Sequence, residues 1–121
     1  MRVNWMELTK KAMKSIGHLA RGNEKIMDCI NNLDQAGTVH GALHPKTREL
    51  VALAVASTTR CDTCIALHAR AAAEAGATRE ELLEVLGISV GLNAGAAIVS
   101  SSKALEAFDS FKETDEPPQY Q

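Results

Sequence analysis

Residues 45–75 read PKTRELVALAVASTTRCDTCIALHARAAAEA and predict two consecutive helices joined by a short turn. Pro45 suits the first turn of a helix, because a residue there needs no backbone N–H donor. The segment ELVALAVAS, which begins at Glu49, is apolar on nearly every side, as is typical of a helix at the centre of a protein. The second helix is expected over residues 61–75 and ends at Gly76, since glycine commonly follows the last turn of a helix.

The N-terminal third of the chain predicts two more helices from the spacing of its apolar residues. A helix over about residues 4–20 carries apolar side chains at three- and four-residue intervals. A second helix is expected between Asn23, a suitable N-cap, and Gly37. Its inward-facing residues would be Ile26, Ile30 and Leu33. Residues 38–44 are expected to form the loop that leads into Pro45.

The C-terminal third predicts a fifth and a sixth helix. Thr78 and Glu81 have the spacing of a capping box, which begins a helix that runs to about Leu92. The sixth helix is expected from about Asn93 to Phe111 and begins with small residues that allow close approach of another helix. An apolar third helix and a small-residue sixth helix together predict a homo-oligomer, because they offer more adhesive surface than so short a chain can hide.

The length and composition of the chain fit one globular domain. The 121 residues predict an all-α, single-domain bundle of about six helices over residues 1–112, followed by a disordered tail over 113–121. The 13 Lys and Arg residues against 15 Asp and Glu, without a basic cluster, argue against nucleic acid or an anionic membrane as partner. No uninterrupted apolar run approaches the ~18 residues of a membrane span. The polar, charged N-terminal segment does not resemble a signal peptide, so a cytoplasmic location is expected.

Three side chains with reactive groups share one face of the helix over 61–75. At about 100° per residue, Cys61, Cys64 and His68 fall within an arc of about 60°. The two sulfurs are close enough in sequence to form a short-loop disulfide, and such a pair can cycle between dithiol and disulfide. The helix N-terminus favours Cys61 as the thiolate, whereas the one-turn spacing to His68 favours Cys64. The residues alone leave the order of attack open.

Glu49 is the fourth candidate for the same site. Its neighbours on one face of the helix are Ala52, Leu53 and Ala56, so its carboxylate is expected among apolar side chains. The helix–turn–helix would bring Glu49 beside His68, where a carboxylate can orient the imidazole and hold its proton. The simpler interpretation of Glu49 is an ordinary acid in the first turns of a helix, either stabilised by the helix dipole or paired with Lys46.

The sequence from about residue 25 to 110 resembles the carboxymuconolactone decarboxylase-like superfamily, and within it the alkylhydroperoxidase D-like branch. The matching features are Leu43, the Lys46-Thr-Arg-Glu-Leu50 segment, the Glu49–Cys61–Cys64–His68 pattern, Ala72, and Gly76-Ala-Thr followed by Glu80 and Glu81. A CxxC motif by itself recurs by chance, but this ordered set across two helices rarely does.

The resemblance implies an all-α fold that assembles into homotrimers or homohexamers and reduces hydroperoxides, or relays electrons, through a CxxC disulfide. It implies that Cys64 attacks the peroxide, that Cys61 resolves the product, and that His68 and Glu49 relay protons. The expected partners are a hydroperoxide or other small oxidant and an external dithiol, such as a lipoyl or thioredoxin-like reductant, with no cofactor and no metal. Thr63 stands where the peroxidase prototype has a second histidine, and threonine cannot act as a base near neutral pH, which puts efficient peroxide reduction in question.

Three alternatives remain open from the sequence. Cys61, Cys64 and His68 have the spacing of zinc ligands, but no spacing identifies a fourth ligand among Cys29, His40 and His44. The chain could instead serve assembly without catalysis. It could also be a decarboxylase or isomerase in which His68 is the base, although the decarboxylase branch lacks the CxxC pair. Among the residues outside the site, Cys29 is expected to be a packed, inert thiol and His44 a residue of the helix entry.

Overall fold

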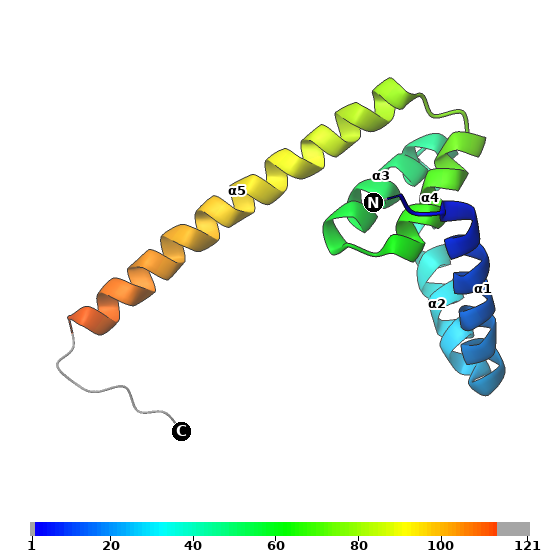
Figure 1. Cartoon of the computed structure of the whole chain (residues 1–121), viewed down its shortest axis with the longest axis horizontal. Coiled ribbons are helices and arrows are strands. Elements are labelled where there is room, and N and C mark those ends of the chain that lie inside the picture. The colour runs from blue at the N-terminus through cyan, green and yellow to red at the C-terminus, as the bar shows by residue number, and fades with distance from the viewer. Residues whose placement is uncertain (1, 114–121) are drawn as a thin grey trace.

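The structure, a computed structural model, describes residues 2–113, and these residues form five α-helices and no β-strand (Figure 1). The helices are α1 (Trp5–Gly22), α2 (Glu24–Gly37), α3 (Pro45–Thr59), α4 (Asp62–Glu74) and α5 (Arg79–Lys112). The all-α prediction is therefore confirmed. The expected tail falls almost entirely on residues 114–121, which lie outside the described residues.

The helices α3 and α4 form an antiparallel hairpin that holds the core. The buried apolar residues of the described chain are Leu50, Leu53 and Ala56 on α3 and Ala66 and Ala72 on α4. Helix α3 contacts both α4 and α5, and α4 also contacts α1. The prediction that the third helix is central is confirmed by these contacts, but not for every side of the helix, since Val51 and Val55 are 51% and 56% exposed.

Local signals set the ends of the hairpin helices. At the start of α3, the His44 ring accepts a hydrogen bond from the Lys46 backbone N–H (3.1 Å), so His44 is the N-cap, as the sequence predicts. Between α3 and α4, Arg60 takes the left-handed conformation (φ 56°) and reverses the chain within two residues. After α4, Gly76 has φ 86°, which only glycine adopts at no steric cost, and it ends the helix where predicted.

The expected fifth and sixth helices are one continuous helix of 34 residues, so the predicted count of about six helices is too high by one. The break expected between Leu92 and Asn93 is absent, and the helix continues through both residues. The side-chain amide of Asn93 donates to the Ser89 carbonyl (2.7 Å), four residues earlier, and so lies along the helix instead of capping a new one.

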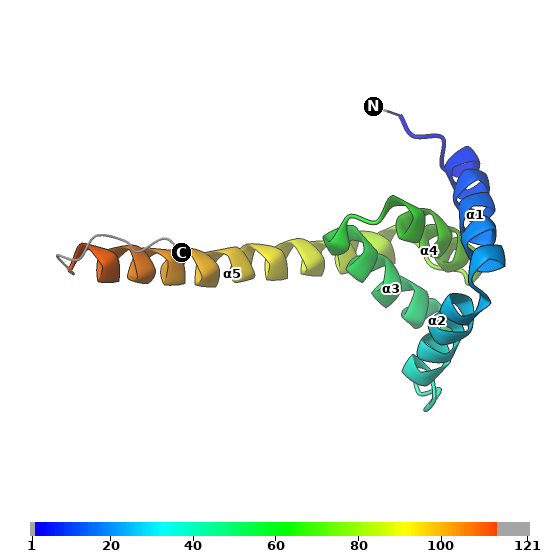
Figure 2. The same cartoon turned by 90° about the horizontal axis from the view of Figure 1, so that it is seen from below.

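Helix α5 projects away from the other four helices (Figures 1 and 2). Among the described elements it packs only against α3, and none of its residues is buried. By length and composition α5 also meets the criteria for a membrane-spanning helix, with a mean hydropathy of 1.8 in its most apolar window. One such helix is weak evidence for a span, because core helices of water-soluble proteins satisfy the same two criteria.

Helix α2 does not bury the residues expected to face inward. Ile26, Ile30 and Leu33 are 39%, 54% and 68% exposed, and Cys29 is an exposed free thiol. The predictions of an inward apolar stripe and of a packed Cys29 are therefore wrong for the single chain. The physical reason is that α2 contacts only α1 among the described elements, so no helix other than α1 is available to cover its apolar residues.

Candidate functional site

The two hairpin cysteines meet at the N-terminus of α4. Cys61 is the N-cap of α4, and its Sγ accepts a hydrogen bond from the Cys64 backbone N–H (3.2 Å). Cys61 and Cys64 are joined by a disulfide, with their Cα atoms 5.2 Å apart. Both residues are half-buried. The first turn of α4 thus carries a redox-capable pair that solvent can reach, at a helix end whose free N–H groups favour a thiolate after reduction.

Glu49 and His68 form a second pair across the hairpin. The Oε2 of Glu49 lies 2.7 Å from the Nδ1 of His68, so α3 and α4 bring together two side chains that are 19 residues apart. A carboxylate only accepts hydrogen bonds, so the Nδ1–H of His68 donates to Glu49. In the neutral ring this tautomer leaves the Nε2 lone pair free to accept a proton.

The surroundings of this pair are less apolar than the sequence suggests. The side chains of Glu49 and His68 are 29% and 41% exposed, so neither is buried. Leu50 and Leu53, on the neighbouring positions of α3, are buried. His68 follows Cys64 by four residues on α4, and residues at this spacing lie beside each other on a helix face. The hairpin therefore places the disulfide, the imidazole and the carboxylate in sequence along one side.

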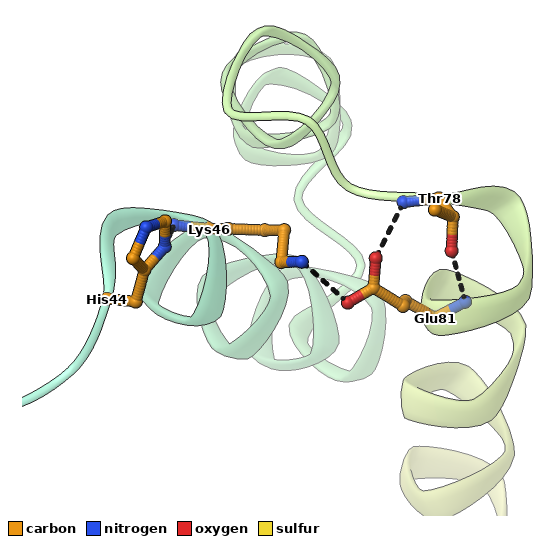
Figure 3. A network of polar contacts seen from close by, with 4 residues as sticks. All are labelled: His44, Lys46, Thr78 and Glu81. Carbon is orange, nitrogen blue, oxygen red and sulfur yellow. Dashed lines mark hydrogen bonds and ion pairs between the residues drawn. The ribbon is translucent and has the colours of Figure 1, made fainter.

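Lys46 does not pair with Glu49, so the Lys46 pairing offered in the simpler interpretation of that acid is wrong. Its Nζ lies 3.0 Å from the Oε2 of Glu81, at the start of α5 (Figure 3). Glu81 also forms the predicted capping box with Thr78: the Thr78 N–H donates to Glu81 Oε1 (3.0 Å), and the Glu81 N–H donates to Thr78 Oγ1 (3.1 Å). The sequence predicts the capping box but not its ion pair with Lys46, since no spacing rule joins residues 35 positions apart.

The hydrogen bond from the Thr78 backbone, followed by the one from Lys46, lowers the pKa of the Glu81 carboxyl from its ordinary value of 4.5. Both bonds favour the charged form of the carboxylate, because each donor interacts more strongly with an anion than with a neutral acid. The ionised Glu81 carboxylate therefore joins the N-terminal turns of α3 and α5.

Among residues 2–113, the structure shows no set of side chains that would complete the zinc site considered from the sequence. Within residues 2–113, no three side chains of His, Cys, Asp and Glu are grouped so that they could hold a metal ion. Cys29 lies on the exposed α2, and the Nδ1 of His44 is engaged at the start of α3. The described residues that come together at the hairpin are two sulfurs joined to each other and a histidine joined to a carboxylate.

A large open groove lies next to the site, between α1 and α4. It has a volume of about 980 Å³ and is lined by Trp5, Met6, Thr9, Lys10, Met13, Ile65, Ala66, Ala69 and Arg70. Its α4 residues occupy the part of the helix surface adjacent to the one that carries Cys64 and His68. Trp5, Met6 and Met13 are exposed in it, so the groove is an unfilled apolar surface of the single chain.

A comparison with protein families identifies the family of this chain. The model of the carboxymuconolactone decarboxylase family matches residues 24–107, a range that includes Glu49, both hairpin cysteines and His68. The chain belongs to the carboxymuconolactone decarboxylase family. This family includes decarboxylases and alkylhydroperoxidase D-type peroxidases.

Relatives of this family member extend over most of its length. A protein of Haemophilus influenzae is 44% identical over 108 residues, which are 89% of this chain and 96% of that protein. Protein 4 of the cox locus of Paracoccus denitrificans is 35% identical over 99 residues, 82% of this chain and 89% of that protein. The crystal structure of an apo carboxymuconolactone decarboxylase family protein from Legionella pneumophila has a TM-score of 0.69 and 36% identity, covering 90% of this chain and 97% of that one.

Proposed function

We propose that this family member is a thiol-dependent oxidoreductase of the alkylhydroperoxidase D-like type, which reduces hydroperoxides through the Cys61–Cys64 pair. The observation that carries the proposal is the combination of a disulfide in the first turn of α4 with a Glu49–His68 hydrogen bond one turn further on. A purely structural disulfide would need neither the exposed helix end nor the adjacent imidazole.

The reaction begins with the reduced pair. Cys64 attacks the terminal peroxide oxygen, so that an S–O bond forms and the O–O bond breaks. His68 accepts the Cys64 thiol proton at Nε2 and returns it to the leaving oxygen, which departs as an alcohol. The sulfur is oxidised to a sulfenic acid and the peroxide is reduced by the same two electrons.

The second half closes the disulfide. The sulfur of Cys61 attacks the sulfur of the Cys64 sulfenic acid, an S–S bond forms, the S–O bond breaks, and water leaves with the Cys61 proton. An external dithiol then reduces the disulfide by two thiol–disulfide exchanges and is itself oxidised. The sum is one hydroperoxide and one dithiol converted to an alcohol, water and a disulfide.

The spacing to His68 supports Cys64 as the attacking residue. Cys64 lies one turn before the imidazole on α4, whereas Cys61 lies a further turn away and caps the helix. Glu49 holds Nδ1–H and thereby directs Nε2 as the base, the role of the orienting member in a nucleophile–base–orienter set. Thr63 supplies no second base beside Cys64, so the proton transfer rests on His68.

The test is a thiol titration before and after a slight excess of an organic hydroperoxide. Because Cys29 is exposed and could react by itself, the experiment uses Cys29→Ser protein alongside wild type. The reduced Cys29→Ser protein should lose both titratable thiols and gain a Cys61–Cys64 disulfide in the peptide map. Two unreacted thiols would contradict the proposal, and so would an intermolecular disulfide as the main product.

We also propose that the chain works as a homo-oligomer. Helix α5 exposes apolar residues along its length, among them Ile88, Leu92, Ile98 and Leu105, and the α1/α4 groove is open. Exposed apolar surface of this extent is typical of an interaction site, and most oligomers of water-soluble proteins join copies of the same chain. The monomeric arrangement leaves these surfaces without cover among the described residues.

A further inference from the structure

Helix α3 carries two ion pairs on adjacent positions of its surface. Lys46 and Glu49 are three residues apart, a spacing at which oppositely charged side chains on a helix pair with each other. In this structure each of them pairs with another helix instead. Lys46 bonds Glu81 on α5, and Glu49 bonds His68 on α4. The acid that holds the catalytic imidazole thus lies next to a lysine that could compete for it.

Glu81 is a fixed acceptor for this lysine. One carboxylate oxygen accepts the Thr78 backbone N–H (3.0 Å), and the other lies 3.0 Å from Lys46 Nζ (Figure 3). The reciprocal bond from the Glu81 N–H to the Thr78 hydroxyl (3.1 Å) completes the capping box. Both oxygens are therefore engaged, and the backbone bond aims the second oxygen at α3.

We propose that Glu81 is a positioning residue of the proton relay: by holding Lys46 at the start of α5, it keeps the Glu49 carboxylate available to His68. The inference rests on the proposed function, since it concerns the same relay. Glu81 touches neither sulfur nor imidazole in the described contacts, and it acts only through the choice of partner for Lys46.

Without the Glu81 charge, Glu49 is the nearest alternative for Lys46 along its own helix. The positions three and four residues from Lys46 are Ala42, Leu43, Glu49 and Leu50, and only Glu49 is acidic. The side chains of Lys46 and Glu49 are 32% and 29% exposed, so a lysine side chain can move between the two acceptors through solvent. A Lys46–Glu49 pair would withdraw carboxylate oxygens from the imidazole and loosen its orientation.

The other charged groups on α4 and in the first turns of α5 form no bond with the side chain of Lys46 or Glu49. These groups are Asp62, Arg70 and Glu74 on α4 and Arg79, Glu80 and Glu84 in the first turns of α5. Arg70 pairs with Glu74 (3.0 Å) on the exposed side of α4. Within residues 2–113, the Glu49 side chain bonds His68 and the Lys46 side chain bonds Glu81.

The test compares Glu81→Gln, Lys46→Met and the double variant, all in reduced Cys29→Ser protein. Glutamine keeps the capping box, because its side-chain oxygen still accepts the Thr78 N–H, but it loses the charge that holds Lys46. Two readouts are used at neutral pH: the rate of Cys64 alkylation by iodoacetamide, followed by mass spectrometry, and the downfield NMR signal of the His68 Nδ1 proton. Neither requires peroxide.

Glu81→Gln should slow Cys64 alkylation by up to about twofold, the size expected when a competing helix ion pair of this spacing forms. It should also weaken the His68 Nδ1 proton signal. Lys46→Met removes the same link to α5 without releasing a competitor, so it should leave both readouts as in the parent protein. The double variant should recover the parent rate and signal, since the competitor is then gone.

An unchanged rate and signal in Glu81→Gln would overturn the inference. A double variant as slow as Glu81→Gln would also overturn it, since the effect would then come from the docking of α5 and not from Lys46. Glu49→Gln serves as the reference for the relay itself. If Glu49→Gln has no effect on alkylation and hydroperoxide leaves the thiols unoxidised, the proposed function fails, whereas an effect of Glu49→Gln without one of Glu81→Gln removes only this inference.

Discussion

The α3/α4 hairpin and helix α5 are both rich in apolar residues, yet they end in opposite environments. The hairpin contributes all five buried apolar residues of the described chain, whereas the 34 residues of α5 include none. The difference lies in geometry. A two-residue reversal at Arg60 and Cys61 folds α3 onto α4, while α5 continues past its contact with α3 without a break.

The comparison shows that the apolar residues of the hairpin form the core, whereas those of α5 remain on the surface. The hairpin buries leucine and alanine side chains between α3 and α4 and brings Glu49 to His68. Helix α5 keeps its apolar side chains outside, where a second copy could cover them. Hydropathy alone does not distinguish a helix that is buried within its own chain from one that is buried by another chain.

The largest expected effect tests whether the redox chemistry resides in the hairpin. Cys64→Ser should abolish hydroperoxide turnover, because it removes the sulfur that forms the S–O bond. Cys61→Ser should permit one oxidation and then stall as a sulfenic acid or a mixed disulfide. Cys29→Ser, which changes the exposed thiol of α2, is the control and should turn over as wild type does. Mass spectrometry of each variant after one addition of peroxide reads the outcome, and a sulfenic acid on Cys61 in Cys64→Ser would reverse the assigned roles.

The next effect concerns the relay across the hairpin. Glu49→Gln should keep the fold, since glutamine is nearly isosteric and a good helix former. It should lower turnover by about 10²–10⁴-fold, the usual contribution of positioned proton transfer. Stopped-flow peroxide consumption measures the loss, and circular dichroism checks the fold. Glu74→Gln is the matched control, because its carboxylate pairs with Arg70 on the exposed side of the same hairpin. Equal turnover of the two variants would show that Glu49 is an ordinary acid at the start of a helix.

A pair of leucine truncations tests the comparison of the two regions directly. Leu53→Ala, at a position 4% exposed in α3, should reduce the free energy of unfolding by about 2–5 kcal/mol. Leu92→Ala, at a position 71% exposed in α5, should cost under about 0.5 kcal/mol in dilute solution, where copies are apart. Urea unfolding at a series of protein concentrations measures both.

Self-association predicts that the cost of Leu92→Ala rises with protein concentration, because assembly then buries α5. Light scattering of wild-type protein at micromolar concentration should show a species several times heavier than the 12.9 kDa chain. A monomer with no concentration dependence would break the assembly proposal. Recovery of the protein with lipid vesicles would instead favour the membrane-spanning interpretation of α5.

The sequence predicts the hairpin well because its signals are local. Pro45 and Gly76 mark helix ends by backbone preference, and the apolar run after Glu49 identifies the central helix. The approach of Glu49 to His68 also follows, since a short turn between two helices leaves few arrangements. Outside the hairpin the signals weaken. The expected break falls where Gly91, Asn93 and Gly95 lower the helix propensity, yet α5 continues through this segment, so low propensity alone does not mark the end of a helix.

The wrong prediction of a packed Cys29 and the missed ion pair of Lys46 have a common physical cause. The surroundings of both side chains depend on tertiary contacts between segments that are distant in the sequence. The apolar stripe of α2 indicates that something covers it, but not whether that cover is part of the same chain. Lys46 has an acid at helical spacing, and only the placement of α5 shows that a better-held acid is within reach.

The smallest expected effect concerns the contact that joins α5 to the hairpin. Because the Thr78 backbone N–H and then Lys46 lower the folded-state pKa of Glu81 below its ordinary 4.5, the ionised carboxylate contributes stability above that value. As the pH falls from 4.5 toward the lowered folded-state pKa, the unfolded chain takes up the proton first, and the contribution is lost. Glu81→Gln should therefore be less stable than wild type at neutral pH, and the gap should narrow in acid. Urea unfolding across this range measures the gap, with Glu80→Gln as the control, since Glu80 takes no part in the capping box. A gap that is constant with pH would mean that the Glu81 charge does not help to hold α5 against the hairpin.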